Sequence, residues 1–301
     1  MGFGRAGAHF GELLQGAFRL DGGVRRGLVT LPMPDLFSRA MFAMEAGEGL
    51  EVISAGRSQR SLLKVRRAAA ECLTRWTGNE RGGTLSLAGN IPAGRGMGSS
   101  TSEIVATVRA VADAFGVEPD AGEVAEITAR CESASDPLMF DAAERIGPAL
   151  FEQRRGRILV KLGGRLPAFT VVGFDPGGPG LSTDDLEPPE YTEAEVGVFG
   201  GLLGEFGEAV RRGDAGRVGR VATASAEINQ RYRPKPDFEE VVALGSECGA
   251  VGVSVAHSGT VMGLLFDPDR EETWLGAVAA ANHLRGLGYR VWRFGTEQRI
   301  G

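Results

Sequence analysis

Lysine is the scarcest charged residue of this chain. Lys64, Lys161 and Lys235 are its only lysines, and arginine supplies the rest of the positive charge. A phosphate-binding loop of the Walker A type needs a lysine directly before its Ser or Thr. None of the three lysines lies near the glycine-rich loop at residues 90–102, so a Walker A site is excluded there.

Cysteine and long apolar runs are also scarce. Cys72, Cys131 and Cys248 are odd in number, far apart and without a Cys-x-x-Cys pair. We therefore expect three reduced, mostly buried thiols rather than a disulfide framework or a metal centre. No run of 18 apolar residues exists, so no transmembrane helix is expected. The first residues lack a charged region followed by an apolar one, which predicts a cytoplasmic protein.

Positive charge is in deficit, because the formal net charge is −6. Nucleic acids and anionic membranes both attract basic surfaces, so neither is expected as a partner. The 301 residues, 43% of them hydrophobic, can bury one large core or two moderate ones, and the length favours two domains.

Apolar periodicity predicts an α+β chain. A joint near residues 161–168 predicts domains at 1–165 and 166–301. The expected strands cover residues 49–54, 84–88, 157–160, 169–174, 251–256, 260–266 and 289–294, and the expected helices cover 61–76, 102–115, 120–131, 192–212, 214–230, 237–247 and 269–287.

The most informative segment runs from Asn90 to Ser102. It places Gly94, Gly96 and Gly98 at every second position, directly before hydroxyl residues and a predicted helix. Glycines let backbone N–H groups approach a ligand closely, and the helix points its positive end at the same place. This pattern predicts a phosphate site.

A dinucleotide-binding pattern, Gly-x-Gly-x-x-Gly, also occurs literally at Gly2–Gly7. That fingerprint requires a strand before it and a helix after it. No strand can precede residue 2, so the pattern is rejected as a cofactor site.

Three motifs resemble those of the GHMP kinases, the family of galactokinase, homoserine kinase and mevalonate kinase. Pro92–Thr101 is similar to the second family motif, and Gly249–Gly263 is similar to the C-terminal one. Gly11-Glu12-Leu13-Leu14-Gln15-Gly16 resembles the L-threonine kinase branch of cobalamin biosynthesis. Before it stand His9 and Phe10, where that branch usually has a small residue and a cysteine.

The resemblance implies the GHMP kinase architecture, with an N-terminal domain like ribosomal protein S5 domain 2 and a C-terminal ferredoxin-like domain. The N-terminal domain would bind ATP, and Mg²⁺ would be held by Ser100, with Glu132 as a further ligand. Helix N-capping by Ser99 or Ser100 is the structural alternative. The expected nucleotide-binding residues are Pro92, Gly94, Arg95, Gly96, Met97, Gly98, Ser99, Ser100 and Thr101.

Phosphoryl transfer also needs a carboxylate near the acceptor hydroxyl. Pro137 favours an extended backbone at Asp136, so we assign Asp136 as the catalytic base. It could instead end the helix or anchor substrate, and Asp141 is the reserve candidate. The expected acceptor-binding residues are His9, Glu12, Gln15, Ser258 and Gly259, with Glu12 receiving an ammonium group; the basic segment 229–236 is expected to be a solvated loop.

The resemblance therefore implies an ATP-dependent kinase that phosphorylates the hydroxyl of a small metabolite. L-Threonine is the preferred acceptor, giving L-threonine O-3-phosphate for the nucleotide loop of cobalamin. Homoserine or another hydroxylated metabolite remains an alternative, as does a nucleotide and metabolite sensor without catalysis. The oligomeric state is left open, with a homodimer allowed.

Overall fold

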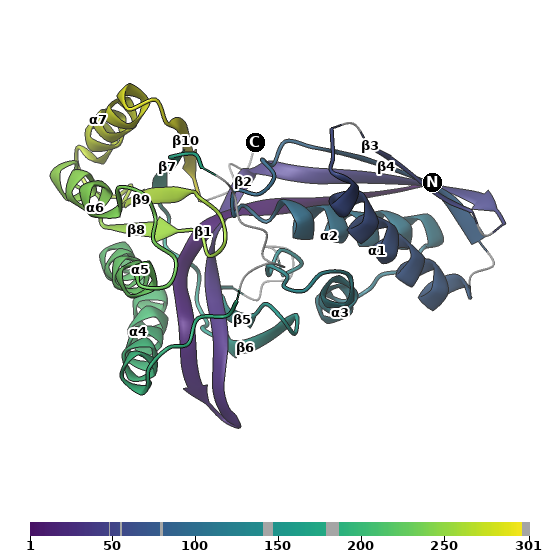
Figure 1. The fold of residues 1–301 in the computed structure, drawn as a ribbon, viewed down its shortest axis with the longest axis horizontal. Coiled ribbons are helices and arrows are strands. Elements are labelled where there is room, and N and C mark those ends of the chain that lie inside the picture. The colour runs from purple at the N-terminus through teal and green to yellow at the C-terminus, as the bar shows by residue number, and fades with distance from the viewer. Residues whose placement is uncertain (48, 55, 79–80, 141–146, 179–186, 297–301) are drawn as a thin grey trace.

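The computed structural model describes residues 1–47, 49–54, 56–78, 81–140, 147–178 and 187–296. Its strands join in a ten-stranded sheet with the order β10-β7-β9-β8-β1-β2-β4-β3, and β5 and β6 extend from β2 off this path (Figure 1). The strands are β1 (Gly2–Leu20), β2 (Gly23–Ala46), β3 (Leu50–Ser54), β4 (Arg81–Gly89), β5 (Ala149–Glu152), β6 (Arg157–Lys161), β7 (Thr170–Asp175), β8 (Gly252–Val255), β9 (Met262–Phe266) and β10 (Arg290–Gly295). The helices are α1 (Gln59–Thr77), α2 (Ser99–Phe115), α3 (Ala121–Cys131), α4 (Glu193–Arg212), α5 (Ala215–Gln230), α6 (Phe238–Glu247) and α7 (Thr273–Gly286).

The predicted helices and strands after residue 48 are confirmed to within a few residues. Local signals explain this agreement, because several helices begin at side chains that accept backbone N–H bonds. Ser58 caps α1, Asp120 caps α3 and Thr192 forms a capping box with Glu195 at the start of α4. No helix in the part of the chain that the structure describes is long and apolar enough to cross a membrane.

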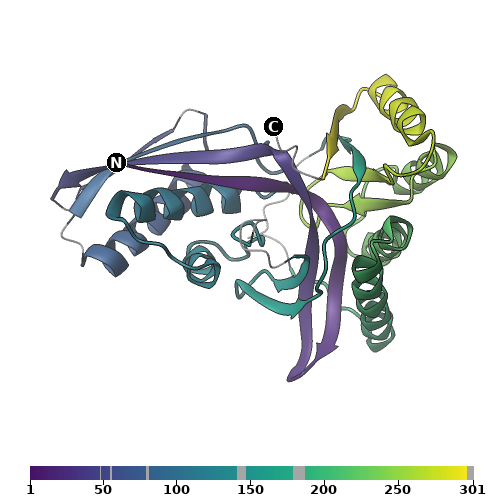
Figure 2. The same cartoon turned by 180° about the vertical axis from the view of Figure 1, so that it is seen from behind.

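The largest difference from the sequence predictions is the hairpin of β1 and β2, where no strands were predicted. The two strands pair antiparallel from Gly2 opposite Phe42 to Leu20 opposite Gly23, and they run along both halves of the molecule (Figure 2). The register shifts after Gly7 and again on either side of Glu12. Such shifts break the period-two alternation by which a strand is recognised in a sequence.

The Gly2 to Gly7 pattern has a packing role in this hairpin. A Cβ atom added at Gly2 would lie 2.2 Å from the Ala114 nitrogen, and one at Gly4 would lie 2.0 Å from the Ala106 oxygen. The backbone of α2 therefore rests directly on β1. This contact accounts for the two glycines without a cofactor.

The C-terminal part has a ferredoxin-like arrangement. Its antiparallel strands lie in the order β10-β7-β9-β8, and α4 to α7 lie to one side of them (Figure 1). The sheet continues into β1 through the pairing of Glu12 with Val255. The predicted α+β fold is confirmed, and the domain boundary at 165/166 remains a prediction.

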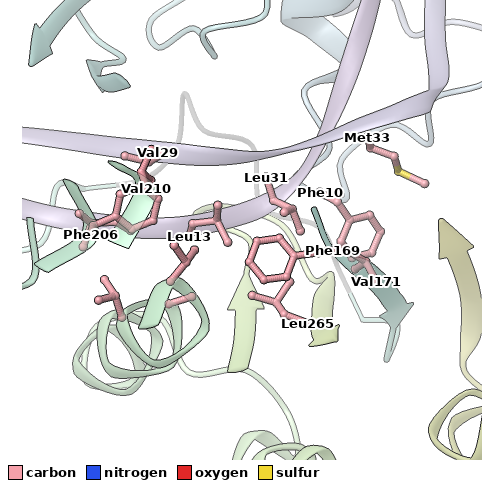
Figure 3. Close-up of a cluster of buried hydrophobic side chains, with 14 of the residues drawn as sticks. Phe10, Leu13, Val29, Leu31, Met33, Phe169, Val171, Phe206, Val210 and Leu265 are labelled. Atoms are coloured by element: carbon pink, nitrogen blue, oxygen red, sulfur yellow. The ribbon is translucent and has the colours of Figure 1, made fainter. Parts of the chain in front are cut away.

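One hydrophobic core crosses that predicted boundary. Phe10 and Leu13 of β1 pack in it with Phe169 and Val171, at the start of β7, and with Phe206 of α4 (Figure 3). All five side chains are fully buried or nearly so. The shared core holds the middle of β1, where the candidate site lies, in a fixed position.

Candidate active site

A cavity of about 410 Å³ lies where the middle of β1, the start of α2 and the loop after α3 meet. Segments far apart in the sequence supply its walls, and residues of all three motifs lie among them. The predicted site residues that line it are His9, Glu12, Gly94, Gly96, Met97, Gly98, Ser99, Ser100, Thr101, Glu132, Asp136 and Ser258.

The glycine loop adopts a backbone that other residues rarely accept. Gly94, Gly96 and Gly98 all have φ between 71° and 79°. Gly98 begins α2 without a side-chain cap, and the Ser100 hydroxyl instead donates to Glu132 Oε2 at 2.8 Å. The alternative that Ser100 is an N-cap is therefore wrong. The start of α2 faces the cavity, where its dipole favours an anion.

The C-terminal motif packs directly against this loop. A Cβ atom at Gly259 would lie 2.0 Å from the Arg95 carbonyl oxygen, and one at Gly96 would lie 2.5 Å from Ala256 Cβ. The Val261 N–H also donates to the Arg95 carbonyl. Gly259 thus supports the phosphate loop from behind, while Ser258 lines the cavity.

The two predicted Mg²⁺ ligands, Ser100 and Glu132, lie together in the structure and form a candidate metal site. Ser100 and Thr101 both donate to the Glu132 carboxylate, at 2.8 and 2.6 Å, and Lys64 Nζ lies 3.8 Å from it. Burial raises the pKa of Glu132 to about 7, although the Thr101 hydroxyl opposes this. Carboxylate and hydroxyl oxygens beside a phosphate cradle are suited to Mg²⁺, which usually binds through one or two protein ligands and substrate phosphates.

His9, Glu12 and Asp136 form a buried cluster beside the phosphate loop in the same cavity. His9 Nε2 lies 3.1 Å from Asp136 Oδ2, and His9 Nδ1 lies 3.9 Å from Glu12 Oε1. Burial lowers the pKa of His9, but the two carboxylates outweigh it and raise that pKa to about 9. Burial also opposes ionisation of Asp136, yet His9 and a 2.8 Å hydrogen bond from Gln153 hold its pKa below the usual value. His9 and Asp136 are therefore an ion pair.

Glu12 has a buried carboxylate oxygen that lacks a hydrogen-bond partner within the described residues. Its side chain is 3% exposed, and Oε2 has no hydrogen-bond partner within the described residues. Burial raises the pKa of Glu12 to about 8, against the opposing charge of His9. A buried carboxylate that faces a cavity is stabilised by a bound cation.

Within the described ranges, four predicted site residues do not line the cavity: Gly259, which supports the loop from behind, and Gln15, Pro92 and Arg95. Arg95 Nε pairs with Asp175 Oδ2 at 3.2 Å, which ties the glycine loop to the end of β7. Gln15 lies behind His257, and its Oε1 is 2.6 Å from His257 Nδ1. Pro92 precedes the glycines and, in the described structure, is not part of the cavity wall. The reserve candidate Asp141 lies outside the described residues.

Several residues of the site were not predicted. Gln153 follows β5, a strand absent from the predictions, and donates to Asp136. The start of α1 adds Arg57, Ser61 and Lys64 to the wall. Helical periodicity could not mark these polar residues, because on a single helix they resemble an exposed face.

The basic segment 229–236 is also part of the site region. Lys235 Nζ donates to the Gly259 carbonyl at 2.6 Å, and Arg233 donates to the His257 carbonyl at 3.2 Å. The expectation of a solvated loop is therefore wrong. Burial, followed by these two cations, lowers the pKa of His257 to about 3, so its ring is neutral.

Comparison with known proteins agrees with this geometry. The sequence models of the GHMP kinases N terminal domain and of the GHMP kinases C terminal match residues 63–143 and 208–283. The chain belongs to the GHMP kinase family. The two matched regions contain α2 with its serines and the C-terminal motif, which are the segments that meet at the cavity.

Two relatives within this GHMP kinase family share sequence with the chain. L-Threonine kinase of Citrobacter freundii is 29% identical over 192 residues, which are 62% of this chain and 64% of that protein. L-Threonine kinase of Salmonella typhimurium is 28% identical over 191 residues, with 62% and 61% covered. The match thus spans less than two thirds of either relative.

Solved structures of GHMP kinases have the same fold. Homoserine kinase of Cytophaga hutchinsonii superposes with a TM-score of 0.71, at 16% identity, over 99% of this chain and 95% of its own. Mevalonate kinase of L. major in complex with R-mevalonate gives a TM-score of 0.64, at 15% identity, over 100% and 96%. At these identities the likeness establishes the fold alone.

Proposed function

We propose that this GHMP kinase family member transfers the γ-phosphoryl group of ATP, with Mg²⁺, to the hydroxyl of a small amino acid. L-Threonine is the first candidate, and the product would be L-threonine O-3-phosphate for the nucleotide loop of cobalamin. The observation that carries the proposal is that one cavity brings two groups of residues together. The phosphate loop with Ser100 and Glu132 and the buried cluster of His9, Glu12 and Asp136 both line it.

The phosphate loop is suited to the donor. Backbone N–H groups between Gly94 and Ser100 would hold the ATP phosphates at the start of α2. Ser100 and Glu132 would ligate Mg²⁺, which when bound neutralises charge on the phosphates. Positioning and neutralisation supply most of the rate enhancement in phosphoryl transfer.

Asp136 is suited to the acceptor hydroxyl. Its carboxylate is ionised and lies 3.1 Å from the His9 ring, which fixes its orientation. The hydroxyl proton would pass to Asp136 as the new O–P bond forms and the bond from the γ-phosphorus to the ADP oxygen breaks. Because the pKa of Asp136 is low, its work as a base would come late in the transfer, when the hydroxyl is already acidic.

Glu12 is suited to the ammonium group of an amino acid. An incoming –NH₃⁺ would supply the partner that Glu12 Oε2 lacks within the protein. This is the feature that favours L-threonine over a neutral polyol or a hydroxy acid. The similarity to two L-threonine kinases supports the same acceptor.

The test is an ADP-release assay over acceptors that carry different combinations of ammonium, carboxylate and hydroxyl groups. L-Threonine, L-serine and L-homoserine carry an ammonium group, a carboxylate and a hydroxyl, whereas aminopropanol lacks the carboxylate and mevalonate lacks the ammonium group. We expect L-threonine to give the highest kcat/KM and mevalonate to give no ADP above background. If every acceptor fails while ATP still binds, the protein is a sensor of the same fold.

The variant Glu12→Gln distinguishes acceptor binding from ATP binding in the same assay. It should raise the KM for L-threonine about tenfold or more and leave the affinity for ATP unchanged, since a charge-assisted hydrogen bond contributes about 1.5–3 kcal/mol. Glu103→Gln is a matched control, because Glu103 is also buried in the wall but is paired with Arg57 at 2.8 Å on the α1 side. An equal effect of both variants on the KM for L-threonine would contradict the role of Glu12.

A further inference from the structure

A second cavity of about 610 Å³ adjoins the candidate active site. Ala134, Gln153 and His257 line both cavities, so the two meet at these residues. The second cavity, here called the side chamber, lies between the β1–β2 hairpin, the β5–β6 hairpin and residues 188–191. It is larger than the catalytic cavity, and free threonine would not extend through it.

The side chamber is rich in arginine. Arg25 and Arg26 approach from the β1–β2 hairpin, Arg154 and Arg155 from the β5–β6 turn, and Arg233 from the segment after α5. This concentration stands out in a chain whose net charge is −6. Guanidinium groups bind carboxylates and phosphates through paired, charge-assisted hydrogen bonds.

Two of the three acidic residues of the chamber wall, Glu152 and Glu193, are paired with arginines, and the third is Glu190. Glu152 pairs with Arg157 at 2.7 Å and with Arg155 at 3.8 Å, and Glu193 pairs with Arg19 outside the chamber.

Arg26 and Arg233 keep their charge, whereas Arg155 is paired with Glu152 at 3.8 Å. Arg26 donates to the Pro189 carbonyl at 2.9 Å, and Arg233 donates to the carbonyls of His257 and Glu187. Carbonyl groups orient a guanidinium without neutralising it. Burial and then the charge of Arg154 lower the pKa of Arg233.

We propose that the side chamber binds an anionic group, a carboxylate or a phosphate, on a small molecule that reaches the active site past His257 and Gln153. The proposal rests on the proposed function insofar as the anion is the far end of the acceptor. The acceptor would then be a hydroxy amino acid that carries an anionic extension. A separate small anion bound beside the acceptor has the same chemistry, and the experiment distinguishes the two sources.

The probes are two dipeptides that differ only in one carboxylate, L-threonyl-L-aspartate and L-threonyl-L-asparagine. Isothermal titration calorimetry without ATP measures their binding, so no turnover is needed. We expect the aspartate dipeptide to bind about tenfold tighter, with a difference that shrinks at high salt. Arg25→Gln and Arg154→Gln should each remove most of this preference. Arg130→Gln on the exposed surface of α3 has the same charge change and should keep it.

Citrate, titrated alone and in the presence of L-threonine, tests the separate anion. Citrate binding that weakens about tenfold in Arg154→Gln, together with equal affinity for both dipeptides, would assign the chamber to a separate anion. If neither citrate nor the aspartate dipeptide binds in a way that depends on Arg25 or Arg154, the proposal is overturned. Thermal unfolding midpoints equal to those of the unaltered protein establish that the variants are folded.

The proposed function fails independently of this result. If no acceptor in the ADP-release assay is phosphorylated, while the arginine-dependent preference for the aspartate dipeptide persists, the chamber is an anion site in a non-catalytic protein. If L-threonine is phosphorylated and no arginine-dependent binding is found, the kinase stands and the chamber has no anionic ligand.

Discussion

Three ionisable side chains share one buried position beside the phosphate loop. His9, Glu12 and Asp136 are at most one-sixth exposed, and the charge state of each depends on the other two. With His9 protonated and Asp136 ionised, Glu12 remains near the point of ionisation at neutral pH. An acceptor cation would complete the charge balance of the cluster.

Removal of the Asp136 charge should affect catalysis much more than ATP binding. Asp136→Asn should lower kcat about 100-fold, because the hydroxyl proton loses its acceptor. The affinity for ATP, measured by calorimetry, should change less than about twofold.

A double-mutant cycle isolates the ion pair of Asp136 with His9. If they act as a unit, His9→Gln combined with Asp136→Asn should cost less in kcat than the sum of the two single effects. Fully additive effects would show that His9 and Asp136 do not act as a unit. An unchanged kcat in Asp136→Asn would assign the base to another residue.

The same cluster makes stability depend on pH. The pKa of His9 rises from about 6.5 to about 9 on folding, and that of Glu12 rises from about 4.5 to about 8, so the folded protein holds more protons than the unfolded chain. The stabilisation from His9 is complete below pH 6.5 and is lost as the pH rises through 9. The contribution of Glu12 changes in the same direction between pH 4.5 and 8. From these two groups the free energy of unfolding should fall by about 4–5 kcal/mol between pH 6.5 and 9, and Lys235, whose pKa falls to about 8 on folding, should offset about 1–2 kcal/mol of this.

Urea unfolding at a series of pH values measures this dependence. His257 has the opposite sign, because its pKa falls to about 3 on folding and acid therefore destabilises the protein below pH 6.5. We expect maximum stability at about pH 5, where the opposing contributions of Glu12 and His257 balance. The double variant His9→Gln with Glu12→Gln should lose the fall between pH 6.5 and 9, and a slope equal to that of the unaltered protein would contradict the assignment.

The glycine loop and the C-terminal motif act together as one element. The loop carries the ligand-facing N–H groups, and Gly259 with Ala256 fixes its shape from behind. Both Gly259 and Gly96 lie at close approaches between the two segments, where an added Cβ atom would come within 2.0 Å of Arg95 and within 2.5 Å of Ala256. The affinity for ATP should therefore depend on the packing of Gly96 against Ala256, although Ala256 does not bind a phosphate itself.

Alanine at two neighbouring glycines tests this contact. Gly94 and Gly96 have φ values of 71° and 79°, so alanine costs about 1–2 kcal/mol of backbone strain at either one. At Gly96 the added Cβ atom would also lie 2.5 Å from Ala256 Cβ. At Gly94 no heavy atom lies within 4 Å of the added Cβ atom. Gly96→Ala should weaken ATP binding tenfold or more beyond the effect of Gly94→Ala, measured by calorimetry. Equal losses would show that the C-terminal motif does not hold the loop.

Local signals explain which elements the sequence could predict. α1, α3 and α4 have capping side chains and amphipathic faces, and their predicted bounds are close to the observed ones. β1 and β2 have neither signal, since glycines and register shifts interrupt their alternation. β5, at four residues, is too short to show a period.

The residues of the candidate site also differ in whether local sequence signals could predict them. Ser100, Glu132 and Asp136 lie at or shortly beyond the ends of predicted helices, and all three line one cavity in the structure. Gln153 and Arg233 could not be placed, since their contacts join residues 17 and 24 positions apart through loops. Arg95 was assigned to the nucleotide from its place in the motif, but Asp175 lies within reach on the other side.

The molecule as a whole is unified by its sheet and by the core beneath β1. That core combines side chains from both predicted domains, including Phe10 and Phe206. The two halves should therefore unfold together although two family models match them separately.

Phe206→Ala tests this cooperativity. Loss of a fully buried phenylalanine typically costs 3–5 kcal/mol, and here the loss should lower the stability of both halves. Unfolding followed by far-ultraviolet circular dichroism and by tryptophan fluorescence should remain a single coincident transition. Val198→Ala on the same helix, with Val198 50% exposed, should change stability by less than about 0.5 kcal/mol. Separate transitions for the two probes would indicate two independent domains.

The position of β1 also bears on how such a protein could acquire a new substrate. Donor recognition depends on α2, the glycine loop and the C-terminal motif, whereas His9 and Glu12 stand on a short stretch of β1 where the strand register already shifts. Variation at those few positions, and in the hairpin arginines farther along, would alter the acceptor pocket without disturbing the ATP apparatus. A library confined to residues 8–15 and 24–28 is therefore a compact search space for redirecting this scaffold to another alcohol.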